Sequence, residues 1–270
     1  MPHRETPVTF DSGEVTLHGV LHRAPEARGV FVFCHPFAEE KKCAHRVLVD
    51  AARALCDHGY SALLFDYRGC GDSEGEFVEA TPEGWLADIR RAVEFARQEG
   101  VPVGLLGVRL GATLAAQVAE SLPGIAWLAL WEPISDGAQY VSQNLRRSMI
   151  KAMLTDKEGF KAEEVRSAHE AATIDFDGYH VAQESRRQIE ATKLGEEKLA
   201  FGGRALVLGI SAREQASDKI VALAGQYSQG VAGGVRQEPF WNKIGLVESL
   251  PAIEATLKWL DGEGAAEPTS

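Results

Sequence analysis

The sequence predicts an α/β protein with a mostly parallel, doubly wound sheet and an inserted helical cap. Short continuous apolar runs alternate with segments of helical periodicity, which is the pattern of parallel strands covered by helices on both faces. Two glycines, Gly107 and Gly111, separate one such strand from the helix that follows it. With 270 residues, 45% of them hydrophobic and 25% charged, the chain has the size and composition of one globular domain.

The elements follow from periodicity along the chain. Residues 7–11 and 14–22 alternate between apolar and polar around a turn, which predicts an antiparallel hairpin at a sheet edge. Continuous apolar runs predict buried strands at 29–34, 60–66, 103–108, 125–131 and 204–210, with a last strand within 230–240. Apolar spacing predicts helices at 44–58, from Pro82 to Gly100, after Gly111 and at 251–260.

Residues 135–198 break this alternation, because they are rich in charge and show no buried strand. Their apolar residues recur at helical spacing, as in Leu145, Met149, Met153 and Leu154. We therefore expect a helical cap that covers the carboxyl edge of the sheet, where ligands bind in such folds. The predicted core then consists of residues 1–134 and 199–262, followed by a frayed tail at 263–270.

Composition excludes several classes of partner. The net charge of −11 argues against nucleic acid and against an anionic membrane surface. Because the N-terminus has no apolar signal core and no run of about 18 apolar residues occurs, we expect a cytoplasmic protein. The four cysteines lack the paired spacing of a zinc site, so we expect free thiols, no metal and no cofactor. The oligomeric state stays open.

The segment Gly107-Val108-Arg109-Leu110-Gly111 is the most informative stretch. Glycines at both ends indicate a tight strand-to-helix turn in which backbone crowds the central residue. The central residue is Arg109, which stays protonated at any working pH and cannot attack a carbonyl.

Three motifs together resemble those of the α/β-hydrolases between about residues 5 and 262. The turn matches the family's G-x-S-x-G frame, except for Arg109 at the nucleophile position. His35-Pro36-Phe37 is similar to the stretch that supplies one oxyanion-hole amide, and residues 66–75 resemble the family's D-x-R-G-x-G-x-S loop. Within the superfamily, residues 107–112, 131–137 and 176–179 resemble the exosortase A system-associated hydrolases. That group is found beside the machinery for protein sorting and exopolysaccharide production.

The resemblance also assigns the remaining positions of a catalytic triad. Glu238 stands where the family has its histidine, and His180 is the last histidine of the chain. The acid would come from the loop after residues 204–210, where Glu214 or Asp218 is available. A serine acyl-enzyme needs a hydroxyl beside a base, so the usual mechanism is not expected here.

Two interpretations of Arg109 remain open. In the first, Arg109 forms an ion pair with Glu238, Glu214 or Glu132, and the former catalytic centre is filled. In the second, Arg109 binds a carboxylate or phosphate, aided by the amides of Leu110 and Phe37. Further candidates for the ligand pocket are His35, Trp131 and Phe240.

The leading functional hypothesis is a degraded hydrolase that binds an anionic or acyl-like ligand near Arg109. The alternative is an active esterase-like or acyltransferase-like enzyme with a non-standard site, for which Cys70 is one candidate nucleophile. We expect Cys34 to belong to the core, and Asp66 and Ser73 to stabilise their loop.

Overall fold

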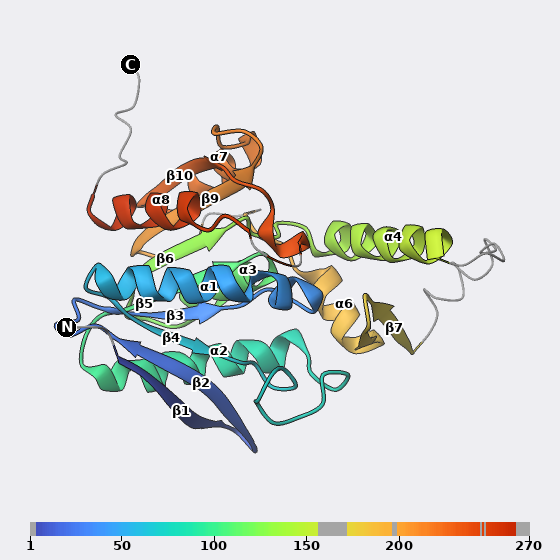
Figure 1. The fold of residues 1–270 in the computed structure, drawn as a ribbon, viewed down its shortest axis with the longest axis horizontal. Coiled ribbons are helices and arrows are strands. Elements are labelled where there is room, and N and C mark those ends of the chain that lie inside the picture. The colour runs from blue at the N-terminus through green and yellow to red at the C-terminus, as the bar shows by residue number, and fades with distance from the viewer. Residues whose placement is uncertain (1–3, 156–171, 196–198, 244, 246, 263–270) are drawn as a thin grey trace.

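The computed structural model describes residues 4–155, 172–195, 199–243, 245 and 247–262, and these residues build one eight-stranded sheet (Figure 1). The strand order is β1-β2-β4-β3-β5-β6-β9-β10. β2 pairs antiparallel with β1 and β4, and the other neighbours pair in parallel. The bounds are β1 Arg4–Ser12, β2 Val15–Arg23, β3 Val30–Cys34, β4 Ser61–Phe65, β5 Val103–Val108, β6 Ile125–Trp131, β9 Arg204–Ser211 and β10 Gly230–Arg236. The predicted fold class is confirmed.

Helices cover both faces of the sheet. Alternate residues of β3 enter two separate apolar clusters, since neighbouring side chains of a strand point to opposite faces. One cluster packs against α2, α3 and α7, and the other against α1 and α8. The helices are α1 Glu39–Asp57, α2 Pro82–Ala96, α3 Leu110–Ser121, α7 Asp218–Ala224 and α8 Leu250–Leu260, with short 3-10 helices η1 Arg97–Glu99 and η2 Phe240–Asn242. The sequence pattern does not predict α7.

Helix α1 begins at Glu39, earlier than the predicted start at residue 44. Its first turn is polar and charged, so the apolar periodicity could not mark it. The chain enters the helix through Ala38, whose φ of 51° is rare for a residue with a Cβ. This start brings Glu40 into the helix, where it is only 4% exposed.

The inserted segment contains helices and, in addition, a short two-stranded hairpin that the prediction of a helical cap did not include. It consists of α4 Gly137–Thr155, the hairpin of β7 Thr173–Phe176 and β8 Tyr179–Ala182, and α6 Gln183–Ala191. Both turn residues, Asp177 and Gly178, have positive φ, as a type I′ hairpin turn requires. Residues 156–171 and the predicted tail at 263–270 lie outside the described residues.

The insertion lies at one end of the sheet, where Figure 1 shows α4, α6 and β7 together. The Phe37 ring, just after β3, lies 5.8 Å from the Phe176 ring of β7. The insertion therefore lies over the carboxyl end of β3, beside the residues that follow β3 and β5.

Candidate functional site

Arg109 lies at the bend between β5 and α3, with φ 56° and ψ −123°. This left-handed backbone costs of order 1–3 kcal/mol for a residue with a Cβ. Both flanking glycines are needed for steric reasons. A Cβ at residue 107 would lie 2.4 Å from Ala112 Cα, and one at residue 111 would lie 2.2 Å from the Cys34 carbonyl oxygen. The predicted tight turn is confirmed in these contacts.

The guanidinium of Arg109 faces a buried carboxylate and two aromatic rings. Its Nε lies 3.5 Å from Oε1 of Glu40, with the two side chains 16% and 4% exposed. Arg109 Cζ lies 4.9 Å from the centre of the Trp241 ring and 5.6 Å from that of Tyr140. Both distances are within the range of a cation–π interaction. The side chain therefore sits in a cage of one carboxylate and two rings.

None of the three carboxylates predicted to pair with Arg109 is its partner. Glu238 is largely exposed and pairs with Lys243 at 2.7 Å. Glu132 accepts a hydrogen bond of 2.7 Å from the amide of Ile210, and Glu214 lies exposed on its loop. The first interpretation was therefore right about an internal ion pair and wrong about its partner.

The sequence contains a signal for Glu40 that apolar spacing alone does not reveal. Glu39 and Glu40 are acidic residues of the first turn of α1, a place where carboxylates are stabilised by the helix dipole. The predicted helix starts at residue 44 and therefore does not include these two residues. The adjacency of β3 and β5 then brings the start of α1 to the bend.

Glu40 is held in an environment that favours its neutral form. Burial raises the pKa of Glu40, and the charges of Arg109 and Arg147 together with the Tyr140 hydroxyl only partly oppose this. Among the described residues, neither Glu40 Oε2 nor Arg109 Nε has a partner at full hydrogen-bond geometry. Unpaired polar atoms at this depth are costly, so the cluster is under-satisfied.

Trp131 and Phe240, predicted to line a ligand pocket, belong instead to the core. Both have an exposed fraction of zero, and their rings pack edge to face with centroids 6.3 Å apart. The indole nitrogen of Trp131 donates a hydrogen bond of 2.9 Å to Thr256 on α8. The residue of η2 that reaches the bend is Trp241.

The other predicted pocket residues do come together. His35, Phe37 and Leu110 line one cavity beside the bend, together with Tyr67, Cys70 and Trp85. Its volume of about 10 Å³ is close to the space needed for a single water molecule.

The ring of His35 is neutral and engaged on both sides. Its Nδ1 donates to the Pro36 carbonyl at 2.8 Å, and its Nε2 accepts a hydrogen bond of 3.3 Å from the amide of Tyr67. Burial, aided by the nearby charge of Lys41, lowers the pKa of His35 to about 3. His35 is therefore unsuited to act as a general base at neutral pH.

The cysteines are all free. Cys34, Cys43 and Cys56 are buried, as predicted for structural thiols, and Cys34 lies in the core. Cys70 is partly exposed at the cavity, but burial raises its pKa to about 12. A thiol with such a pKa is almost fully protonated at pH 7, so Cys70 is a poor nucleophile.

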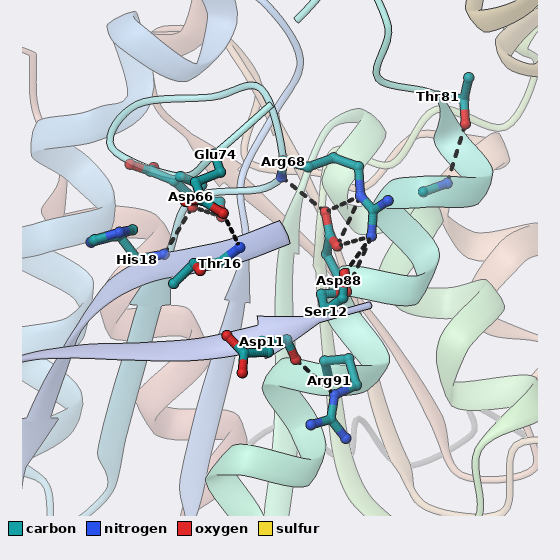
Figure 2. Close-up of polar contacts among 12 residues, drawn as sticks. Asp11, Ser12, Thr16, His18, Asp66, Arg68, Glu74, Thr81, Asp88 and Arg91 are labelled. Atoms are coloured by element: carbon teal, nitrogen blue, oxygen red, sulfur yellow. Dashed lines mark hydrogen bonds and ion pairs between the residues drawn. The ribbon is translucent and has the colours of Figure 1, made fainter. Parts of the chain in front are cut away.

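The loop at residues 66–75 is held by the polar contacts that Figure 2 shows. Ser73 donates to the Asp66 carbonyl at 2.6 Å and accepts from the amide of His18 at 2.9 Å. Arg68 donates to both oxygens of the fully buried Asp88, at 2.7–3.1 Å. The predicted stabilising roles of Asp66 and Ser73 are confirmed, and the motif is structural.

A larger hollow of about 670 Å³ lies elsewhere, between α1 and the face of β1, β2 and β4. Lys41 pairs with Asp66 at 2.7 Å at this hollow, and Arg53 pairs with Glu5 at 2.9 Å. The charged side chains Lys41 and Arg53 at this hollow are thus already paired with carboxylates.

Within the part of the chain that the structure describes, no three His, Cys, Asp or Glu side chains gather as metal ligands. No helix in that part has both the length and the apolar character of a membrane span.

Comparison with known proteins places this geometry in a family. The family model described as "Serine aminopeptidase, S33" matches residues 25–202. Protein ABHD12B of Homo sapiens is 31% identical over 126 residues, which cover 38% of this chain and 33% of that protein. Uncharacterized protein RP471 of Rickettsia prowazekii (strain Madrid E) is 26% identical over 139 residues, which cover 49% of this chain and 58% of that protein. The chain thus matches only a third of the first relative's length and somewhat over half of the second's.

Solved structures show the same fold at low identity. Est1E from Butyrivibrio proteoclasticus, bound to ferulic acid, is 17% identical with a TM-score of 0.69, covering 95% of this chain and 98% of that one. Alpha/beta hydrolase domain-containing protein 10 from mouse is 14% identical with a TM-score of 0.61, and the match covers 95% of this chain and 97% of that one. At such identities the similarity shows the architecture alone.

Proposed function

This chain belongs to the serine aminopeptidase S33 family of α/β-hydrolases, and from that premise we propose that it is a non-hydrolysing member. In this proposal the bend at Arg109 corresponds to the turn that carries the nucleophile in the family. Instead of forming an acyl-enzyme, the protein binds an anionic or acyl-like ligand next to Arg109.

The pairing of Arg109 with Glu40 is the observation that carries the proposal. A guanidinium stands where an attacking oxygen would be needed, and it cannot be deprotonated to attack a carbonyl. The rings of Trp241 and Tyr140 occupy the space beside it. A base is missing as well, since the sequence contains no histidine after His180.

The ligand class follows from the groups left at the bend. Arg109 supplies a fixed positive charge at the N-terminus of α3, and helix N-termini favour anions. Leu110 is the first residue of that helix, so its amide lacks an acceptor within the helix. The cavity lined by Phe37 and Leu110 has room for only about one water molecule, so it supports an apolar contact beside the anion and not a long chain.

The cellular setting is part of the same proposal. We place the protein in the cytoplasm, in a protein-sorting and exopolysaccharide context, on the basis of its resemblance to the exosortase-associated group. The net charge of −11 supports a small-molecule ligand over nucleic acid or an anionic membrane.

A serine-directed fluorophosphonate probe and a short p-nitrophenyl ester test the loss of serine hydrolysis. We expect no covalent labelling and no ester turnover above the rate of the Arg109→Ala variant. Labelling of a serine, mapped by mass spectrometry, would refute the proposal and favour an active enzyme with a non-standard site.

A further inference from the structure

Strand β10 forms the edge of the sheet opposite β1, and among the described strands it pairs with β9 alone. Its parallel register with β9 runs over the whole strand without a shift. The amide of Ala205 donates a hydrogen bond of 3.0 Å to the carbonyl of Gln229, just before β10. The amide of Gln237, just after β10, donates one of 2.9 Å to the carbonyl of Ser211. Odd-numbered residues of β10 therefore direct their backbone groups toward β9, and even-numbered residues direct theirs toward the free edge.

The backbone groups at this free edge are open. Among the described residues, no hydrogen bond reaches the amides of Ala232, Gly234 and Arg236. Every residue of β10 is at least partly exposed, and residues 230–235 carry no charge. An exposed row of donors and acceptors on an uncharged strand is a template for pairing with a further strand.

The opposite edge of the sheet is protected against such pairing. Strand β1 carries the charged residues Arg4, Glu5 and Asp11, together with Pro7, which has no N–H to donate. Charged side chains and proline are the usual means by which an edge strand is kept from pairing with another chain. Strand β10 has neither before its last residue, Arg236. The sheet is therefore protected at one edge and open at the other.

Exposed apolar side chains lie on the two helices that flank the open edge. Helices α7 and α8 both contact β10 (Figure 1), and they belong to the apolar clusters on opposite faces of the sheet. Val221 on α7 is 52% exposed, and Leu250 on α8 is 59% exposed. Two such side chains do not make an interface by themselves. They do extend the surface that the open edge offers to a partner.

We propose that β10 pairs antiparallel with β10 of a second copy of this chain, so that the two sheets join across a two-fold axis. An identical strand supplies donors and acceptors at the same alternate spacing, which makes the edge self-complementary. In the register centred on Gly233, Ala232 lies opposite Gly234 of the second copy. Arg236 then lies opposite Gly230, so no like charges meet.

The same symmetry places the flanking helices together. Because the axis passes through the joined sheet, α7 of one copy adjoins α7 of the other on one face, and α8 adjoins α8 on the opposite face. A charged peptide segment would find no charge to pair with along residues 230–235, whereas a second β10 meets no repulsion there. The interface lies at the sheet edge and goes beyond the proposed function.

Sedimentation velocity of the full chain tests the pairing. We expect a species with twice the 29.3 kDa mass of the chain, whose fraction rises with protein concentration up to about 100 μM. Hydrogen–deuterium exchange locates the contact. Peptides covering residues 230–236 should exchange more slowly in the wild-type chain than in Val221→Lys at the same concentration, and peptides covering residues 4–12 should exchange equally in both.

Three variants decide which surface pairs. Ala232→Pro removes an N–H that β9 does not use, so the variant should fold and remain monomeric at about 100 μM. Val221→Lys brings like charges together at the axis and should raise the dimer dissociation constant at least about tenfold. Val78→Lys, at a valine that is 37% exposed in the loop before α2, is the matched control and should dimerise as wild type.

If Ala232→Pro does not fold, Val221→Lys and the exchange of residues 230–236 decide the matter. A wild-type chain that stays monomeric at about 100 μM would overturn the inference. So would a dimer that keeps its affinity in Val221→Lys and shows no slower exchange at residues 230–236. Neither result bears on the serine probe, which tests the proposed function separately.

Discussion

Arg109 and Glu40 meet because the strands that precede them are neighbours in the sheet. Cys34 at the end of β3 pairs with Gly107 in β5, so the chain leaves both strands at the same edge. Each chain then turns into a helix through a residue with positive φ, Ala38 with 51° and Arg109 with 56°. The first turn of α1 thereby brings Glu40 to the side chain of Arg109.

The buried pair of Arg68 and Asp88 (Figure 2) should be essential for stability. Arg68→Ala leaves a fully buried carboxylate without its cation, which we expect to lower the free energy of unfolding by about 3 kcal/mol in urea denaturation. Arg90 lies on the same helix as Asp88, and its side chain makes a long 3.3 Å contact with Ser121. Arg90→Ala should therefore lower the free energy of unfolding by less than about 0.5 kcal/mol. Equal losses would contradict this role for Arg68.

Gly111→Ala tests the close approach of α3 to the end of β3. Alanine normally stabilises a helix by about 1 kcal/mol relative to glycine, yet here its Cβ would lie 2.2 Å from the Cys34 carbonyl oxygen. We expect a loss of about 3 kcal/mol or a failure to fold. Gly202→Ala, where no atom lies within 4 Å of the added Cβ, should leave the thermal midpoint nearly unchanged.

Placing the residue types that the resemblance implies at positions 109 and 238 should not create catalysis. In Arg109→Ser combined with Glu238→His, the new histidine would replace a side chain that is 64% exposed and paired with Lys243. It would therefore lie away from the bend, where Trp241 contacts residue 109. We expect p-nitrophenyl acetate hydrolysis equal to that of Arg109→Ser alone. A clear gain in the double variant would show that residue 238 reaches the bend.

His35 should make stability depend on pH. Its pKa is lowered to about 3 in the folded protein by burial and by Lys41, against about 6.5 when unfolded. Between these values the unfolded chain binds a proton that the folded chain does not. Stability should therefore fall as the pH is lowered through this window, by up to about 1.4 kcal/mol per pH unit.

The His35→Asn variant keeps a donor for the Pro36 carbonyl but cannot titrate, so that part of the pH dependence should disappear. His45→Asn, on the exposed side of α1, is the matched control and should retain the wild-type slope. An unchanged slope in His35→Asn would show that other groups cause the acid sensitivity. Urea denaturation at several pH values measures both.

Several parts of the site could be predicted from the residues alone. The continuous apolar runs predicted β3, β4 and β5, and the two glycines around Arg109 predicted the tight bend between β5 and α3. The turn residues Asp66 and Ser73 predicted a loop stabilised by its own hydrogen bonds.

Other predictions failed for physical reasons that can be stated. The Asp177-Gly178 hairpin was overlooked because its strands are four residues each, and so short an alternation is easily read as part of a polar cap. Phe240 and Trp131 were assigned to a pocket because both follow or end core strands, but periodicity does not say whether an aromatic ring lines a cavity or fills the core.

By itself, the sequence determined the fold class and the bend with Arg109 at its centre, because these depend on periodicity and on steric contacts between near neighbours. Only the tertiary structure decided that Glu40, and not Glu238, Glu214 or Glu132, is the partner of Arg109. That choice depends on the order of the strands and on the residue at which α1 begins. Both are set by packing between segments far apart in the chain, which no local pattern records.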